Sequence, residues 1–231
     1  MWTAVNDAIN ILATDQGVRV LMLSGAGGKS FVSGADISKF ESERASKEAV
    51  TEYNQMTKKV YDGVANFPKP TIAQIDGFCI GGGVGLAASC DIRFCGTGSQ
   101  FAIPAAKLGL GYEYEGVNRL VQIVGPAFTK EVFFTARRFS AQEVASMGFV
   151  NKVIKDKDLA SYCVEVAHMI AANAPLTIEA TKFIANQCML EESEKDLDAC
   201  NAKVIACFES VDYIEGRRAF MEKRTPIFEG K

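Results

Sequence analysis

The chain has 231 residues, of which 48% are hydrophobic, and this length allows one substantial buried core. Its 25 basic and 28 acidic side chains nearly cancel to a net charge of −3, without a basic run, so we do not expect nucleic acid as a partner. No stretch approaches the roughly 20 consecutive apolar residues that span a bilayer, and the first residues do not resemble a signal peptide. We therefore expect no membrane partner and a cytoplasmic location.

Helices and strands alternate along the first part of the chain. Apolar residues at helical spacing predict a helix over residues 2–14, and the apolar run 18–23 predicts a strand buried on both faces of a parallel sheet. The further predicted strands are 71–75, 91–95 and 149–154, and the further predicted helices are 41–66, 84–90, 126–147 and almost everything after 156. This order predicts an α/β core followed by a helical C-terminal segment.

The cysteines and the single histidine indicate no metal or disulfide chemistry. Seven cysteines are an odd number and include no C-x-x-C pair, so we interpret them as reduced side chains. His168 lies in a helical run and is interpreted as structural, because a zinc site built on histidine needs more than one. We expect no metal site.

Two glycine-rich segments invite a ligand-binding interpretation. Residues 28–30 read Gly-Lys-Ser, but Leu23 stands where a phosphate-binding loop needs its first glycine, so we interpret this segment as a turn after a strand. The run Gly81-Gly82-Gly83 opens a predicted helix, where backbone N–H groups without neighbouring Cβ atoms can receive a ligand oxygen. Close packing of that helix on a strand explains the same glycines equally well.

Four segments, in family order and at family spacing, resemble the enoyl-CoA hydratase/isomerase (crotonase) superfamily. They are FVSGADI at 31–37, IDGFCIGGG at 75–83, CDIR at 90–93 and AQEVASMGFVN at 141–151. The resemblance implies a crotonase-like spiral of ββα turns at 1–165 and a helical C-terminal trimerisation segment at 166–231, assembled as a homotrimer or a dimer of trimers. It also implies an acyl-CoA thioester as partner, with CoA as part of the substrate and no separate cofactor.

The resemblance also assigns binding residues. Ala35 and Gly82 match the two positions whose backbone N–H groups hold the thioester carbonyl, and such fixed donors stabilise a developing enolate. The positions that match CoA-binding residues are Ser33, Asp36, Ile37, Phe220 and Lys223. For Phe220 and Lys223, a plain core residue and a solvated charge are the alternatives.

Two features depart from the family pattern. A hydratase carries a pair of glutamates where this chain has Gly85 and Ala105, so the usual two-carboxylate hydration mechanism is not available. Family members also usually begin with a β-hairpin before the helix that here starts at Trp2, and we expect that hairpin to be missing.

The segment 108–116 supplies the candidate catalytic residues. Glu113 stands where dienoyl-CoA isomerases and aryl-CoA dehalogenases carry an aspartate, and we predict that it transfers protons. If this segment is extended, Glu113 and Glu115 point one way and Tyr112 and Tyr114 the other, so that only one pair faces a pocket.

Two other interpretations of the same residues stay open. Tyr112, with the segments 211–216 and 222–226, resembles methylmalonyl-CoA decarboxylases, which need no obligatory base. Tyr112 and Glu113 also suit a cap for a helix that starts near Gly116. The predicted function is an acyl-CoA lyase or isomerase that stabilises a thioester enolate; the alternatives are a methylmalonyl-CoA-type decarboxylase and a catalytically silent acyl-CoA-binding or scaffold homologue.

Overall fold

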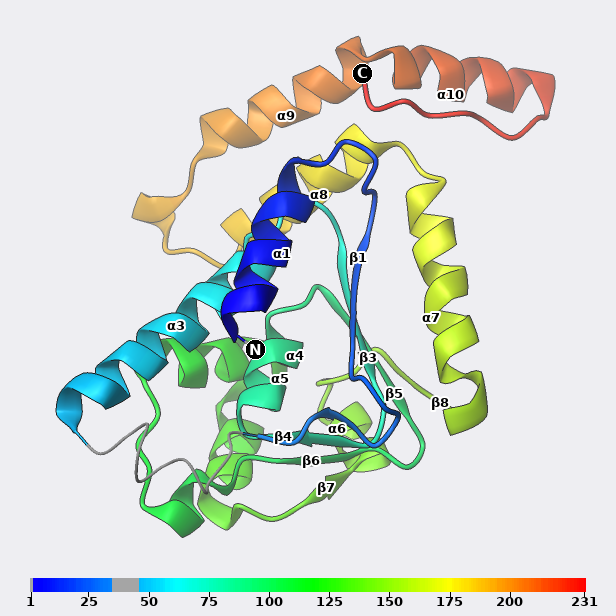
Figure 1. The fold of residues 1–231 in the computed structure, drawn as a ribbon. Coiled ribbons are helices and arrows are strands. Elements are labelled where there is room, and N and C mark those ends of the chain that lie inside the picture. Colours follow the sequence, from blue (N-terminus) through cyan, green and yellow to red (C-terminus); the bar gives the residue numbers. More distant parts are fainter. Residues whose placement is uncertain (1, 35–45) are drawn as a thin grey trace.

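The computed structural model describes residues 2–34 and 46–231. Its helices and strands follow one another as shown in Figure 1. In chain order they are α1 (Trp2–Thr14), β1 (Leu21–Ser24), β2 (Ser30–Val32), α3 (Lys47–Ala65), β3 (Thr71–Ile75), β4 (Phe78–Ile80), α4 (Gly82–Ala88), β5 (Ile92–Gly96), β6 (Gln100–Ala102), the 3-10 helix η2 (Pro104–Leu108), α5 (Tyr114–Thr135), β7 (Phe139–Ser140), α6 (Ala141–Ser146), β8 (Lys152–Ile154), α7 (Asp156–Ala171), α8 (Pro175–Gln187), the 3-10 helix η3 (Glu192–Glu194), α9 (Leu197–Glu209) and α10 (Val211–Glu222).

Two small sheets form the core of the fold. The strand order of the first is β1-β3-β5-β8, and all of its pairs are parallel. The second has the order β2-β4-β6-β7, with only the last pair antiparallel. Each of the first turns gives one strand to each sheet before its helix, as in β3-β4-α4, so the predicted α/β spiral of ββα turns is confirmed.

Some predicted boundaries were wrong. Residues 126–147 do not form one helix, because α5 ends at Thr135, Ala136 turns the chain with φ 45°, and β7 separates α5 from α6. Inside α5 the chain is kinked at Gly125 (φ 75°), immediately before Pro126, which cannot donate a helical hydrogen bond. The predicted strand 149–154 begins only at residue 152.

The first sheet separates two apolar clusters. One side of β3 packs on α1, α3 and α4 through the main cluster, which includes Val64, Phe67 and Ile75. The other side packs on α7, where Leu159 and Cys163 are buried against Ile72 and Phe94. In Figure 1, α7 accordingly lies on the opposite side of this sheet from α1 and α3.

The cysteines are thiols, and most of them lie in the core. All seven are free thiols in the structure, and four of them are buried in the core, including Cys163. Desolvation raises the pKa of the Cys163 thiol to about 11, so it stays protonated at neutral pH.

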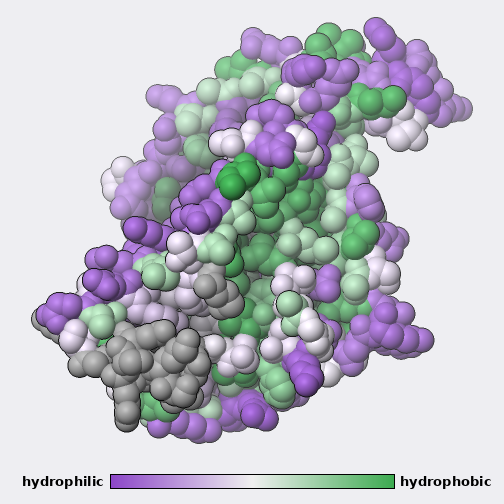
Figure 2. Space-filling model, viewed as in Figure 1, coloured by the Kyte–Doolittle hydropathy of each residue, from purple (hydrophilic) through white to green (hydrophobic). Residues whose placement is uncertain are grey.

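The outer surface shows two apolar regions. Figure 2 shows apolar side chains gathered over β1, between α1 and α7, and β1 is an edge strand in the described part of the chain. Helices α9 and α10 lie beyond the sheets in Figure 1 and expose large apolar side chains such as Phe208 and Met221. The predicted boundary at 165/166 falls within α7, and the division into two segments stays a prediction. No described helix is both long enough and apolar enough to cross a bilayer.

Candidate functional site

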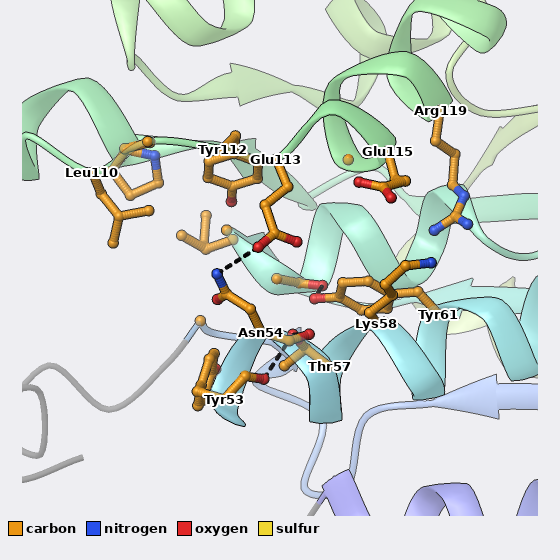
Figure 3. Close-up of a pocket in the computed structure, with 18 of the residues that line it drawn as sticks. Tyr53, Asn54, Thr57, Lys58, Tyr61, Leu110, Tyr112, Glu113, Glu115 and Arg119 are labelled. Carbon is orange, nitrogen blue, oxygen red and sulfur yellow. Dashed lines mark hydrogen bonds between the residues drawn. The ribbon is translucent and has the colours of Figure 1, made fainter. Parts of the chain in front are cut away.

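A cavity of about 220 Å³ lies between α3 and the segment that leads from η2 into α5. Figure 3 shows the α3 side chains on one side of it and those of residues 110–119 facing them. The described lining residues are Trp2, Ser33, Gly34, Tyr53, Asn54, Thr57, Lys58, Tyr61, Asp62, Ile80, Gly81, Gly82, Pro104, Ala105, Leu108, Leu110, Gly111, Tyr112, Glu113, Glu115, Gly116 and Arg119.

The triple glycine packs closely on its neighbours and also lies at the cavity. Gly81 has φ 56° and ψ −114°, a conformation that disfavours side chains, and its N–H donates to the Ala102 carbonyl at 2.8 Å. A Cβ on Gly83 would come within 2.7 Å of the Val32 carbonyl oxygen, so Gly83 is needed for close packing on β2. Gly82, between them, lines the cavity.

Tyr61 of α3 covers the end of this turn. Its hydroxyl donates to the Gly82 carbonyl oxygen at 3.0 Å, and its ring contacts Trp2 edge-on with centroids 5.8 Å apart. A Cβ on Gly85 would lie 3.2 Å from Tyr61 Cζ, so the ring fills the space that a side chain at position 85 would need. Burial raises the pKa of Tyr61, and the phenol therefore stays protonated and available as a donor.

Glu113 faces the cavity from the start of α5. It occupies the N-cap position but makes no side-chain capping bond, so the capping interpretation of its carboxylate is wrong. Its Oε1 instead accepts a hydrogen bond of 2.9 Å from Asn54 Nδ2, which reaches across from α3 (Figure 3). This bond fixes the direction of the carboxylate within the cavity.

The predicted alternation of side chains around Glu113 is also wrong. Tyr112, Glu113 and Glu115 all line the cavity, whereas the Tyr114 side chain is 77% exposed and lies outside it. The reason is that α5 already begins at Tyr114, so the segment turns into a helix instead of continuing as a strand. The Tyr112 ring packs edge-on against Phe133, with centroids 4.9 Å apart.

One end of the cavity carries charge and the other is apolar. Asp62 pairs with both Lys58 Nζ, at 2.6 Å, and Arg119 Nη2, at 3.2 Å, and Arg119 also donates to Ser89. The hydrogen bond to Asp62 raises the pKa of Lys58. Figure 3 shows Leu110 at the end opposite Arg119.

The structure brings together only part of the predicted site. Ser33, Gly82, Tyr112 and Glu113 line one cavity. Phe220 and Lys223 lie at the end of α10, where Phe220 is 83% exposed, and neither belongs to the lining of this cavity. The remaining predicted positions, Ala35, Asp36 and Ile37, lie outside the described residues.

Sequence reasoning missed the contribution of α3. Four of its six lining residues, Asn54, Thr57, Lys58 and Tyr61, are spaced as i, i+3, i+4 and i+7, which places them on one helix face. A polar face of this kind is also typical of a solvated helix, so the spacing alone could not have revealed a cavity. Within the described residues, no group of three or more histidine, cysteine, aspartate or glutamate side chains is placed to hold a metal ion.

Comparisons with known proteins show the family of this chain. A family model described as enoyl-CoA hydratase/isomerase matches residues 1–231. The chain is similar to a crotonyl-CoA hydratase of Syntrophomonas wolfei, at 33% identity over 227 residues that cover 98% of this chain and 86% of that protein. It is also similar to a carnitinyl-CoA dehydratase of Escherichia coli, at 34% identity over 221 residues covering 94% and 84%. The crystal structure of an enoyl-CoA hydratase/carnithine racemase from Magnetospirillum magneticum matches with a TM-score of 0.93 and 33% identity, covering 100% of this chain and 86% of that one.

Proposed function

Because the chain belongs to the enoyl-CoA hydratase/isomerase family, we propose that it acts on an acyl-CoA thioester and transfers a proton at the acyl chain. In this proposal the N–H groups of Gly82 and Ala35 hold the thioester oxygen, and Glu113 carries the proton. The observation that carries the proposal is that Glu113 and Gly82 line one cavity, with the carboxylate held by Asn54.

The proposed chemistry follows from where charge develops. In a double-bond shift, Glu113 removes a proton from the acyl chain, negative charge collects on the thioester oxygen, and the backbone N–H groups stabilise it. Glu113 then returns the proton at a different carbon. In hydration, Glu113 accepts a proton from water as the water oxygen bonds to the β-carbon, and the resulting enolate is protonated at the α-carbon. The bond from Asn54 to Oε1 leaves Oε2 for this transfer.

The relatives favour the addition or elimination of water. A crotonyl-CoA hydratase and a carnitinyl-CoA dehydratase are both named for such reactions on acyl-CoA thioesters. We therefore infer that 2-enoyl-CoA or 3-hydroxyacyl-CoA thioesters are the substrates. Because residue 85 is glycine and residue 105 is alanine, we assign both roles to the Glu113 carboxylate: it accepts the proton from water, and it returns a proton to the α-carbon.

A decarboxylase is the second candidate, because Tyr112 lines the same cavity. In that reaction carbon dioxide leaves a malonyl-type thioester, and the same backbone donors receive the enolate without help from a base. Glu113 opposes this candidate, since an ionised carboxylate in the cavity repels that of the substrate.

The test is turnover of three thioesters by the wild type and by Glu113→Gln. Crotonyl-CoA, a 3-enoyl-CoA and methylmalonyl-CoA are incubated separately, and products are followed by mass. We expect Glu113→Gln to lower kcat on an enoyl-CoA by about 10²–10⁴-fold, the usual contribution of a general acid or base. Glu165→Gln, an exposed glutamate on α7 outside the cavity, is the matched control.

Three results would contradict the proton-transfer proposal. Unchanged enoyl-CoA turnover in Glu113→Gln removes that residue from the mechanism. Loss of carbon dioxide from methylmalonyl-CoA alone establishes the decarboxylase. CoA binding without turnover of any thioester establishes the silent acyl-CoA-binding or scaffold homologue.

We also propose a homotrimer or a dimer of trimers as the assembly. The support is the apolar surface of α9 and α10, where Leu197, Ile205, Phe208 and Ile214 are each more than half exposed. Light scattering should give three or six times the chain mass of 25.0 kDa, and a mass of one chain would contradict the proposal. The cytoplasmic location expected from the sequence stays a prediction.

A further inference from the structure

The triple glycine cannot fix its own conformation. Glycine is the residue with the widest choice of backbone angles, and three in succession carry no side chain to restrict them. Gly82 is therefore held by the first turn of α4, which begins there, and by contacts from other elements. On one side Gly81 N–H is held by the Ala102 carbonyl, and on the other Gly83 is packed against Val32.

Tyr61 supplies the contact to Gly82 itself. Its hydroxyl donates to the Gly82 carbonyl oxygen at 3.0 Å, and a Cβ on Gly82 would lie only 2.8 Å from that hydroxyl. The ring is held from behind by Trp2 and lies against Gly85, so it has a fixed place relative to the turn. Tyr61 is a cavity-lining residue, and it touches Gly82 on the side of the backbone that faces α3.

We propose that Tyr61 is a positioning residue that, together with the first turn of α4, keeps the Gly82 backbone N–H directed toward the thioester oxygen. This inference rests on the proposed function, in which Gly82 is one of the two donors to that oxygen. The Gly82 N–H belongs to the same peptide unit as the Gly81 carbonyl, which accepts from the Val84 N–H at 3.0 Å. The Tyr61 hydroxyl holds the next peptide unit through the Gly82 carbonyl. With both units held, rotation at Gly82 that would turn its N–H away is restricted. A preorganised donor of this kind needs no rearrangement when negative charge appears on the substrate.

The inference explains why the cavity contains a half-buried tyrosine next to glycines. A donor that is misdirected by a small rotation stabilises the enolate less, although the substrate still binds through its other contacts. The expected loss therefore falls on kcat and not on KM, because the interaction gains strength mainly as charge develops.

The experiment compares the wild type with Tyr61→Phe, which removes the hydroxyl and keeps the ring over Gly85. Butyryl-CoA labelled with carbon-13 at the thioester carbonyl serves as a saturated ligand, and its carbonyl stretching frequency is measured by infrared difference spectroscopy. We expect the wild type to lower this frequency relative to free butyryl-CoA, and Tyr61→Phe to lower it less. With the substrate that the wild type turns over, kcat should fall about tenfold, the value of one ordinary hydrogen bond, with KM within about twofold.

The matched control is Tyr162→Phe, which removes a hydroxyl on α7 outside the cavity and should leave both readings unchanged. A carbonyl shift in Tyr61→Phe equal to that of the wild type overturns the inference and leaves the proposed function intact. A wild type that binds butyryl-CoA without any carbonyl shift overturns both. If Tyr61→Phe reduces the carbonyl shift but the wild type turns over no thioester, the inference is supported and the proposed reaction is wrong.

Discussion

The starts of α5 and α6 use a glutamate in opposite ways. At α6, Glu143 completes a capping box with Ser140, accepting from its N–H at 2.8 Å and from its hydroxyl at 2.9 Å, and it also binds Arg137 at 2.7 Å. At α5, Glu113 occupies the N-cap position but leaves the helix uncapped, and its carboxylate reaches Asn54 across the cavity.

This difference separates a structural carboxylate from a candidate functional one. The first turn of every helix has N–H groups without helical partners, and a side chain that satisfies them stabilises the helix. Glu143 does so and has no oxygen to spare for a ligand. Glu113 forgoes that stabilisation and is directed at the cavity, which is the pattern expected where function competes with local stability.

The larger effect is expected from breaking the contact that directs Glu113. Asn54→Ala should lower kcat/KM about 10- to 100-fold, because a hydrogen bond to a charged group contributes about 1.5–3 kcal/mol. The melting temperature should change by less than about 2 °C, since the bond lies at the cavity surface and joins no core elements.

Asn201→Ala, an exposed asparagine on α9, is the control for the loss of an amide from a helix. If steady-state kinetics on the enoyl-CoA substrate show no difference between Asn54→Ala and the wild type, the carboxylate is directed by something other than Asn54.

A smaller effect, on stability alone, is expected at α6. The hydrogen bonds from Ser140 N–H, Arg137 and the Ser140 hydroxyl lower the pKa of Glu143 from 4.5 to about 2. A lowered carboxyl pKa means that the stabilisation is complete above pH 4.5 and is lost as the pH falls toward 2. Glu143→Gln should therefore unfold at lower urea concentration than the wild type at pH 6, with a smaller difference at pH 3.

Turnover by Glu143→Gln should equal that of the wild type at neutral pH. A urea midpoint that differs by the same amount at both pH values would show that the carboxylate charge has no part in the cap.

The sequence predicted those parts of the site that depend on local chain chemistry. The triple glycine is visible in the sequence, and the structure shows Gly81 with a positive φ at the turn before α4. Glu113 was singled out because it stands where dienoyl-CoA isomerases and aryl-CoA dehalogenases carry an aspartate, and the structure places it in the cavity lining. The parallel strand 71–75 was predicted with correct bounds, because all its side chains but one are buried.

What the sequence did not predict depends on contacts between distant segments. Asn54 and Glu113 are 59 residues apart, and no local pattern indicates that their helices face each other. In the sequence, Tyr61 looks like any half-buried tyrosine on an amphipathic helix. Only the structure shows that it contacts Gly82 and Gly85. The strands β2, β4 and β6 have three residues each, too few for an alternation pattern to be recognised.

The contact between Tyr61 and Gly85 has a consequence for how this protein can change in evolution. Position 85 is where the resemblance to hydratases places a glutamate, and a side chain there meets the Tyr61 ring at 3.2 Å from its first carbon. A glutamate at position 85 would thus require the Tyr61 ring, whose hydroxyl binds Gly82, to shift by a few tenths of an ångström. We therefore expect the effect of a substitution at one of these two positions to depend on the residue at the other.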